Sequence, residues 1–394
     1  MNKVWAPTGV PTIYKIIEEL DKRYDVNFFF TAKDSGKGYF SSWHHTKDQF
    51  LFVKGINSRI NIISGVDFFP DFLPLLIKKF LRELRQSLKL IFLAYTGKYD
   101  LIYIDHANIL VGAILKTIFP KLNVVFRIMG VYPSMRKALE PTKLSHFLFR
   151  WAYSRKYNLV ICTQDGSGVE CWLDKAINND TPKKILLNGV SLNSSSYEES
   201  TKFLSLPKNK KIIVYVGKLE YYKGCFDFVE SVVILSKTSR NFHALVIGVG
   251  NEEDNLKKII NKAECSHLIS FIPRLSHKEI MSVFHSANIY VSMNKLGNLS
   301  NVNLEAIQSD CCMILPKINS NCIDNFTRQI LKDSVCYCEP DNPEMLAKKM
   351  REILKSKKIE ISYKEKLKDY KQDFLISWDE RMLKEIQLLE NINK

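Results

Sequence analysis

Short apolar runs alternate with amphipathic stretches along almost the whole chain. In the first half, the amphipathic stretches have the spacing of helices, as at residues 12–22 and 108–118. Strands that alternate with helices in this way predict a parallel sheet with crossover helices, so the expected fold class is α/β. The apolar runs that predict strands are 2–6, 26–31, 60–64, 100–104, 123–128 and 158–162.

The alternation pauses at residues 188–211, a polar stretch with three consecutive serines that is typical of a linker. It then restarts, which predicts two doubly wound domains in series that face each other across a cleft. Ligands of such sheets bind beyond the carboxyl ends of the strands. The expected strands of the second half are 211–217, 243–250, 268–272, 288–292 and 312–316, and the expected helices are 223–237, 252–263, 276–286 and 303–309.

Basic residues exceed acidic ones by 57 to 42 among 394 residues, a net charge of +15. A surplus of this size favours an anionic partner: nucleic acid, an anionic membrane surface or a phosphorylated substrate. The chain has no basic motif with interleaved aromatic residues of the kind that nucleic-acid modules carry, so no nucleic-acid partner is expected.

The nine cysteines form no paired framework and no zinc-finger spacing, which predicts free thiols in a reducing compartment. The N-terminal stretch MNKVWAPTGVPTIYK has no apolar core of a secretory signal. No stretch of about 18 uncharged apolar residues occurs, so no transmembrane helix is expected. These features predict a cytoplasmic protein.

The stretch VGKLEYYKG, residues 216–224, connects a predicted strand to a predicted helix. It places Lys218 and Lys223 after the carboxyl end of the strand, where a ligand would lie. Two ammonium groups beside a helix N-terminus suit a diphosphate. Two solvated surface lysines are the alternative interpretation.

Two further loops fall on the same edge of the predicted sheet. Gly248 and Gly250 end one strand as G-x-G, a weak dinucleotide signal that still allows backbone to approach a ligand. Another loop, rich in glycine and asparagine, precedes a short helix that carries Glu305. A carboxylate there can accept two ribose hydroxyls, and it can equally stabilise the helix dipole.

Five segments together resemble the carboxyl-terminal half of glycosyltransferase family 4, retaining enzymes of the GT-B fold. The resemblance covers about residues 205–390, and the N-G-V segment of ILLNGVSLN extends it more loosely toward the first half. In chain order the segments are VGKLEYYKG, ALVIGVGNEEDNLKKI, ISFIPRLSHKEIMSVFHSANIYVSM, NLSNVNLEAI and SWDERMLKEI.

The resemblance implies that Lys218, in place of the family's arginine, and Lys223 neutralise the departing nucleoside diphosphate of a nucleotide sugar. It implies that Glu305 binds the ribose. These three residues are the expected catalytic group. Neither a metal nor a cofactor is expected if two ammonium groups and a helix end stabilise the leaving group. The remaining expected donor-binding residues are Gly217, Gly248, Gly250, Leu299, Ser300 and Asn301.

The chain departs from the family pattern at two positions. Gly297 stands where the first glutamate of E-x7-E normally holds a donor-sugar hydroxyl, and backbone amides around residues 299–301 are the expected substitute. Met129 stands where the family often has histidine. On the acceptor side, Gly9, His106 and Gly130 are expected at the cleft; His106 and Gly9 also fit purely structural roles.

Residues 69–98 form the most informative stretch of the first half. Apolar residues from Leu73 to Leu88 recur at helical spacing, while Lys78, Lys79, Arg82, Arg85 and Lys89 share the other face. This composition fits a helix lying on anionic lipid, and it fits equally a domain helix with its apolar stripe in the core. Docking on the cytoplasmic face of a membrane would favour a lipid-linked glycan acceptor.

The expected organisation is an N-terminal acceptor-side domain over 1–195, a nucleotide-sugar domain over 205–365, and C-terminal helices over 366–394 that return to the first domain. The function expected from the resemblance is retaining transfer of a sugar from a nucleotide-diphosphate donor to a glycan. The alternative is a catalytically silent GT-B binding or scaffold subunit, because of Gly297 and Met129.

Overall fold

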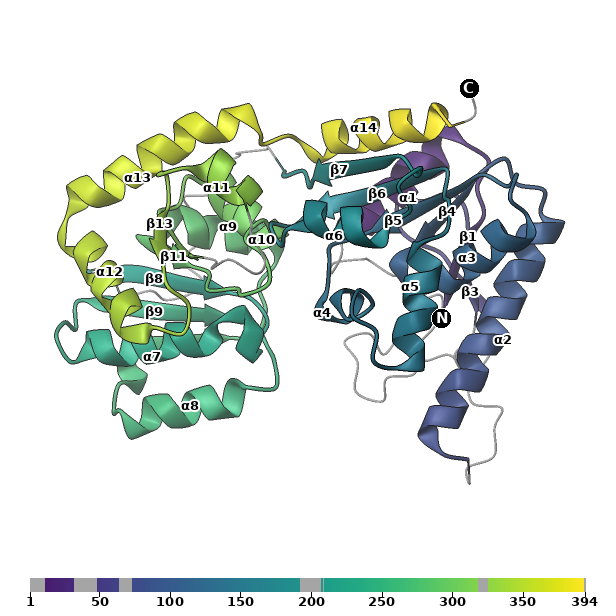
Figure 1. Ribbon diagram of the computed structural model, residues 1–394. Helices are drawn as coiled ribbons and strands as arrows, with labels where there is room; N and C mark the ends of the chain where they lie inside the picture. The colour runs from purple at the N-terminus through teal and green to yellow at the C-terminus, as the bar shows by residue number, and fades with distance from the viewer. Residues whose placement is uncertain are drawn as a thin grey trace.

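The computed structural model describes residues 11–31, 48–63, 73–191, 207, 209–317 and 325–392. The predicted strand at 2–6, Gly9 and most of the predicted linker lie outside these residues. The described chain forms two lobes, one from each half of the sequence, and α14 (Trp378–Glu390), from the end of the chain, lies on the lobe of the first half (Figure 1).

The described strands of the first half form two sheets. A four-stranded parallel sheet has the order β4-β5-β6-β7, and a three-stranded sheet has the order β1-β3-β2. The strands are β1 (Phe28–Thr31), β2 (Gln49–Leu51), β3 (Ile60–Ile63), β4 (Ile102–Asp105), β5 (Val124–Ile128), β6 (Leu159–Gln164) and β7 (Lys183–Leu187).

Two of these strands are not predicted by the apolar pattern. β2 has three residues and pairs antiparallel with β3, whereas the other strand pairs of this half are parallel. β7 starts with two lysines and is only partly buried. Neither strand therefore has the continuous apolar run that a buried parallel strand shows.

The helices of the first half cover both of its sheets. Ile16 of α1 packs against Val125, Leu159 and Ile161 of the four-stranded sheet, and Ile17 packs against the strands of the smaller sheet. The helices are α1 (Pro11–Arg23), α2 (Leu75–Thr96), α3 (Ile109–Ile118), α4 (Pro133–Arg136), α5 (Leu144–Tyr153) and α6 (Val169–Ala176), with a 3-10 turn η2 at His106–Asn108.

Helix α2 exposes its apolar side. Phe80 and Phe92 are each 64% exposed, whereas Arg82 on the other side is 8% exposed. Arg85 and Lys89 pair with Asp48. The exposed apolar side chains contradict the interpretation as a domain helix with its apolar stripe in the core. The interpretation as a helix lying on anionic lipid stays a prediction.

The second half contains one six-stranded parallel sheet with the order β10-β9-β8-β11-β12-β13. This is a doubly wound strand order, in which successive strands are added outward on one side of β8 and then, from β11 onward, on its other side. The strands are β8 (Lys211–Val216), β9 (Phe242–Ile247), β10 (Ile269–Ile272), β11 (Ile289–Val291), β12 (Met313–Pro316) and β13 (Cys336–Cys338).

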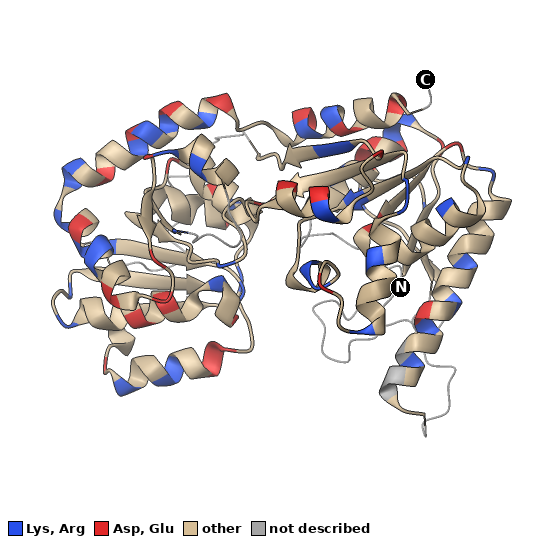
Figure 2. Ribbon diagram, in the orientation of Figure 1, with Lys and Arg blue, Asp and Glu red and all other residues tan. Residues whose placement is uncertain are grey.

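Helices lie on both faces of this sheet, as Figure 1 shows for α7 on one side and α9 and α10 on the other. The helices are α7 (Cys225–Ser236), α8 (Glu253–Lys262), α9 (His277–Ser286), α10 (Asn301–Gln308), α11 (Asn325–Leu331), α12 (Pro343–Lys355) and α13 (Lys357–Tyr370), and the 3-10 turns are η4 (Tyr221–Lys223), η5 (Ser266–Leu268) and η6 (Lys371–Asp373). Lysine and arginine recur along α2, α12 and α13, so the basic surplus is spread over both lobes (Figure 2).

The chain passes between the lobes twice, and the two passages lie side by side. Val190 donates to the carbonyl of Ile376 at 2.9 Å, and Trp378 donates to the carbonyl of Val190 at 3.2 Å. The last helix, α14 (Trp378–Glu390), then packs through Met382 and Ile386 on the four-stranded sheet of the first half. The bounds of the three expected segments remain predictions, because residues 192–206 lie outside the description.

Among the described residues, no helix combines the length and the apolar composition needed to cross a bilayer. The eight described cysteines are all free thiols, and Cys171 is the exposed one among them.

Candidate donor site

The loops that follow β8 and β11 meet at the point where the strand order of the second sheet reverses. β8 and β11 are neighbours in the sheet, although they are not consecutive in the sequence. In doubly wound sheets, ligands bind in the crevice outside the carboxyl ends of the strands at such a reversal. One of these loops carries Lys218 and Lys223, and the other leads to Glu305.

Tyr215, on β8, holds the lysine loop in shape. Its hydroxyl donates to the carbonyl of Lys218 at 3.0 Å and lies 3.4 Å from the carbonyl of Lys223. A single buried side chain thus ties together the two residues whose ammonium groups the sequence places at the ligand. The contact of Tyr215 is not predicted from the sequence, because a tyrosine in an apolar strand carries no signal of it.

The two lysines differ in their surroundings. Lys218 is exposed, whereas Lys223 is partly buried at the end of η4. Burial lowers the pKa of Lys223, and the positive charge of Lys218 lowers it further, while Asp165 and Glu220 act in the opposite direction. Burial and a neighbouring cation thus disfavour the charged form of Lys223, and a bound anion would favour it.

The glycines of the G-x-G loop serve contacts inside the protein. Gly248 has φ +143°, and a Cβ there would collide with the carbonyl oxygen of Gly217. A Cβ on Gly250 would collide with the backbone of Leu219. The N–H of Gly217 also donates to the carbonyl of Ile247 at 2.9 Å. These glycines therefore let the two loops of the site pack backbone against backbone.

Glu305 lies on α10 and faces His277, the first residue of α9. The Glu305 Oε1 and His277 Nε2 atoms are 3.2 Å apart. The hydrogen bond to Glu305 raises the pKa of His277 despite the opposing effect of burial. The sequence does not predict this role of His277, since it stands 28 positions before Glu305 without a shared motif.

The start of α10 is built from the residues expected to hold the sugar. Ser300 is the N-cap, and its side chain accepts a hydrogen bond from the N–H of Asn303 at 3.3 Å. Asn301 accepts from the side chain of Asn188 at 2.7 Å, which links this helix to the end of the first half. These contacts fix the helix start but leave the predicted sugar contacts untested.

The N–H of Leu299 is already bonded across the lobes. It donates to the carbonyl of Asp165 at 3.0 Å, so in this structure it does not offer itself to a sugar. This corrects the expectation that the amide of Leu299 replaces the missing glutamate. At Gly297, a Cβ would stand 2.5 Å from the same carbonyl. The absent side chain at position 297 is what allows the two lobes to touch here.

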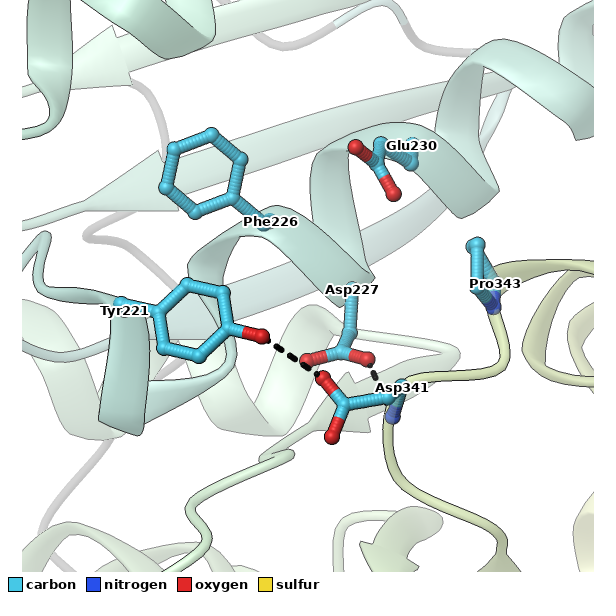
Figure 3. A pocket seen from close by; sticks show the side chains of 6 residues that line it. All are labelled: Tyr221, Phe226, Asp227, Glu230, Asp341 and Pro343. Carbon is cyan, nitrogen blue, oxygen red and sulfur yellow. Dashed lines mark hydrogen bonds between the residues drawn. The ribbon is translucent and has the colours of Figure 1, made fainter.

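A small acidic pocket lies behind the lysine loop (Figure 3). The Tyr221 hydroxyl donates to Asp341 at 3.2 Å, and the N–H of Asp341 donates to Asp227 at 2.7 Å. Lys295 pairs with Asp341, and its own N–H donates to the carbonyl of Tyr222 at 2.9 Å. The contacts of Lys295 thus connect the lysine loop to the loop that follows β11.

The acceptor-side residues have structural partners. His106, on η2, lies 2.7 Å from the Tyr153 hydroxyl and stacks on Phe149 at a ring distance of 6.3 Å. Gly130 follows β5 with φ +134°, next to the carboxylate of Asp165. Neither observation tests whether an acceptor reaches them, and Gly9 lies outside the described residues.

Residues 196–373 match the family model described as Glycosyl transferases group 1. The match lies in the second half of the chain and covers less than half of its length. The same stretch holds the lysine loop, both glycine loops and Glu305. An uncharacterized glycosyltransferase of Haemophilus influenzae is 27% identical over 177 residues, which are 43% of this chain and 48% of the relative. The chain spans half or less of the length of the curated relatives it matches.

Solved structures are similar in fold over nearly the whole length of the chain. Sucrose-phosphate synthase of Thermosynechococcus elongatus has a TM-score of 0.71 at 16% identity, over 98% of this chain and 94% of that one. Anabaena Alr3699/HepE in complex with UDP-glucose has a TM-score of 0.68 at 15% identity, over 98% and 97%. The two-lobed architecture of this chain is the GT-B fold.

Proposed function

We propose that this protein is a retaining glycosyltransferase that moves a sugar from a nucleotide-diphosphate donor to a glycan. The observation that carries the proposal is the Tyr215 contact, because it holds Lys218 and Lys223 together at the reversal point of the second sheet. A diphosphate between the two ammonium groups would relieve their repulsion. It would also restore the pKa of Lys223 toward its ordinary range.

The same cations would act in the chemical step. As the bond between the sugar C1 and the diphosphate oxygen breaks, negative charge develops on the leaving group, and fixed cations stabilise it. In a front-face reaction the acceptor oxygen forms its bond to C1 on the side from which the diphosphate departs. The acceptor proton passes to a diphosphate oxygen, so the configuration at C1 is retained.

Glu305 is proposed to accept hydrogen bonds from the ribose hydroxyls. It lies on the helix that follows β11, and His277 holds one of its oxygens at 3.2 Å. Support for a nucleotide-sugar donor comes from Alr3699/HepE, which has the same fold and was solved with UDP-glucose.

The direct test is a donor screen in two stages. Nucleoside diphosphates and nucleotide sugars are first ranked by the rise they cause in melting temperature, since a ligand of the native state raises it. The best donor is then incubated with glycan acceptors, and nucleoside diphosphate release and the anomeric configuration of the product are measured. An inverted product would contradict retention, and failure of every nucleotide sugar to bind would contradict the proposal.

A catalytically silent GT-B subunit remains the second candidate, and Gly297 is the observation that favours it. The space of a glutamate side chain at this position is filled by the backbone of residues 165–167. A silent subunit would bind a nucleotide sugar in the first stage of the screen and release no diphosphate in the second stage with any acceptor, even after long incubation.

The proposed reaction uses no metal ion. Its test is turnover of the selected donor after treatment with EDTA, followed by addition of Mg²⁺. Unchanged turnover supports stabilisation by Lys218 and Lys223. Loss of turnover with EDTA and its recovery with Mg²⁺ would show that a metal carries the diphosphate charge instead.

The acceptor is proposed to be lipid-linked, with the first lobe docked on the cytoplasmic face of an anionic membrane. The observation behind this is the exposed apolar stripe of α2, whose members recur every three or four residues and so share one face. An apolar helix face among basic residues suits the boundary between lipid headgroups and acyl chains. The stripe consists of Ile77, Phe80, Leu84, Leu88, Phe92 and Tyr95.

A further inference from the structure

Asp165 lies at the point where the two lobes touch. It directly follows β6, and its carbonyl accepts the N–H of Leu299 from the second lobe at 3.0 Å. The missing Cβ of Gly297 would be 2.5 Å from this carbonyl and 3.1 Å from the N–H of Ser167. The residue therefore belongs to the first lobe by sequence and borders the candidate donor site by position.

Two backbone groups hold the Asp165 carboxylate in one orientation. The N–H of Ser167 donates to Oδ1 at 3.0 Å, and the N–H of Val131 donates to Oδ2 at 3.2 Å. Val131 comes just after β5, so the carboxylate lies at the carboxyl ends of two adjacent strands. A carboxylate has about four acceptor positions, which leaves room for further donors beyond these two N–H groups.

The charged groups around Asp165 come from both lobes. Its negative charge opposes the lowering of the pKa of Lys223 in the second lobe. In the first lobe, burial raises the pKa of Tyr132, and the charge of Asp165 adds to that shift. Burial raises the pKa of Asp165 itself, while the N–H bonds of Ser167 and Val131 and the charge of Arg136 oppose the shift. The charge of the carboxylate thus acts on the lysine that is proposed to hold the diphosphate.

We propose that Asp165 is a specificity-determining residue of the donor site, whose carboxylate accepts hydrogen bonds from hydroxyls of the donor sugar. The sugar is attached to the diphosphate, and Asp165 lies at the contact with residues 297 and 299, where the sequence resemblance expects the donor sugar to be held. This inference rests on the proposed function. It assigns to the first lobe a carboxylate contact that the sequence resemblance would place at position 297 of the second.

Gly297 leaves the space that the backbone of residues 165–167 occupies. A side chain at position 297 would push the backbone of residues 165–167 away and would move the carboxylate with it. Glycine at this position and aspartate at 165 are therefore two parts of one arrangement.

The test separates binding of the sugar from binding of the nucleotide. UDP with UDP-glucose, GDP with GDP-mannose and ADP with ADP-glucose are titrated calorimetrically, and the pair containing the tightest-binding nucleotide sugar is used. Asp165→Asn should weaken binding of the nucleotide sugar by about ten- to hundredfold, the usual range for a hydrogen bond to a charged group. It should leave the affinity for the nucleoside diphosphate unchanged.

Gly297→Ala is the second variant, because it displaces Asp165 without altering its chemistry. It should reproduce the selective loss, which keeps the test decisive if Asp165→Asn folds poorly. Asp174→Asn, an exposed aspartate on α6, is the matched control and should change neither affinity. Equal weakening of both ligands, or no weakening of either, in the two site variants would overturn the assignment. If no nucleotide or nucleotide sugar binds the unaltered protein, the proposed function fails and this inference fails with it.

Discussion

Arg127 and Glu385 form an ion pair with no exposed surface, although 258 residues separate them in the chain. The Arg127 Nε atom donates to Glu385 Oε1 at 3.1 Å, and Tyr103 donates to the same carboxylate. Arg381 pairs with the second oxygen at 2.6 Å. These two cations lower the pKa of Glu385, although burial acts in the opposite direction. Charge thus joins α14 to the sheet of the first lobe.

Replacing Glu385 with glutamine should destabilise the protein strongly. Removing one partner of a buried ion pair leaves an uncompensated charge and costs about 3–5 kcal/mol. The check is the denaturant midpoint of unfolding for each protein. Glu380→Gln is the control, because its pair with Lys384 is about half exposed and should contribute less than about 1 kcal/mol. Similar midpoints for both variants would mean that the buried pair does not join α14 to the first lobe.

Gly248→Ala should destabilise the second lobe. Its φ of +143° is strained for any residue with a Cβ, and that Cβ would collide with the carbonyl of Gly217. Such backbone strain costs about 1–3 kcal/mol. Melting by circular dichroism measures the effect, and an unchanged melting temperature would show that the two loops can separate freely.

Local patterns predict most strands and helices here because the period of apolar residues follows secondary structure. The pattern at 211–216 predicts β8, and the amphipathic stretch 108–118 predicts α3. β2 is too short to have a period, and β7 is half-exposed, so no apolar run marks either strand.

The residues of the candidate site also fall into those that the sequence predicts and those that it does not. Lys218 and Lys223 fall within one loop, so the sequence places them together. Asp165 contacts residues 297–299 because the two lobes pack against each other there, and no local sequence pattern predicts that contact. For α2, the sequence shows an apolar stripe but not which side faces the protein, because that depends on partners such as Asp48.

Lys223→Ala should lower the rate of sugar transfer by removing a cation from the leaving group. Loss of one such contact costs about 2–4 kcal/mol of transition-state stabilisation. The measurement is kcat/KM with the donor selected by the screen. Lys218→Ala should have a smaller effect because Lys218 is more exposed to solvent. Lys237→Ala, an exposed lysine at the far end of α7, should leave kcat/KM unchanged. Full activity of Lys223→Ala would contradict its assignment to the diphosphate.

The pair of His277 and Glu305 should make stability depend on pH. The hydrogen bond to Glu305 raises the folded-state pKa of His277 above its ordinary value of 6.5. The stabilisation is therefore fully present below about pH 6.5 and is lost as pH rises through the raised pKa. Exposed pairs contribute about 0.2–1 kcal/mol, so the change should be small.

Melting temperatures between pH 5.5 and 8.5 measure this effect. His277→Gln should remove the part of the pH dependence that the pair causes, and Glu305→Gln should remove the same part. His285→Gln provides a control at the other end of α9. Parallel pH curves for the unaltered protein and for His277→Gln would show that the imidazole and the carboxylate are not coupled in solution.

The exposed stripe of α2 should bind the protein to anionic vesicles. A variant with serine at Phe80, Leu84, Leu88 and Phe92 removes apolar area that is already in water, so its folding should be unimpaired. Burying apolar surface provides about 25 cal/mol per Å². Loss of four large side chains should therefore lower the affinity for vesicles, measured by co-sedimentation, by several orders of magnitude. Donor binding should stay intact.

A charge variant separates the electrostatic part of this attraction. Lys137→Gln with Lys143→Gln changes basic residues of the first lobe outside α2. It should weaken binding modestly, since each basic residue near an anionic leaflet contributes about 1 kcal/mol, and high salt should act in the same direction. Arg82 is unsuitable for this purpose because it is buried, and its replacement would test folding instead. If the unaltered protein fails to sediment with anionic vesicles even at low salt, the stripe serves another partner and a soluble glycan becomes the preferred acceptor.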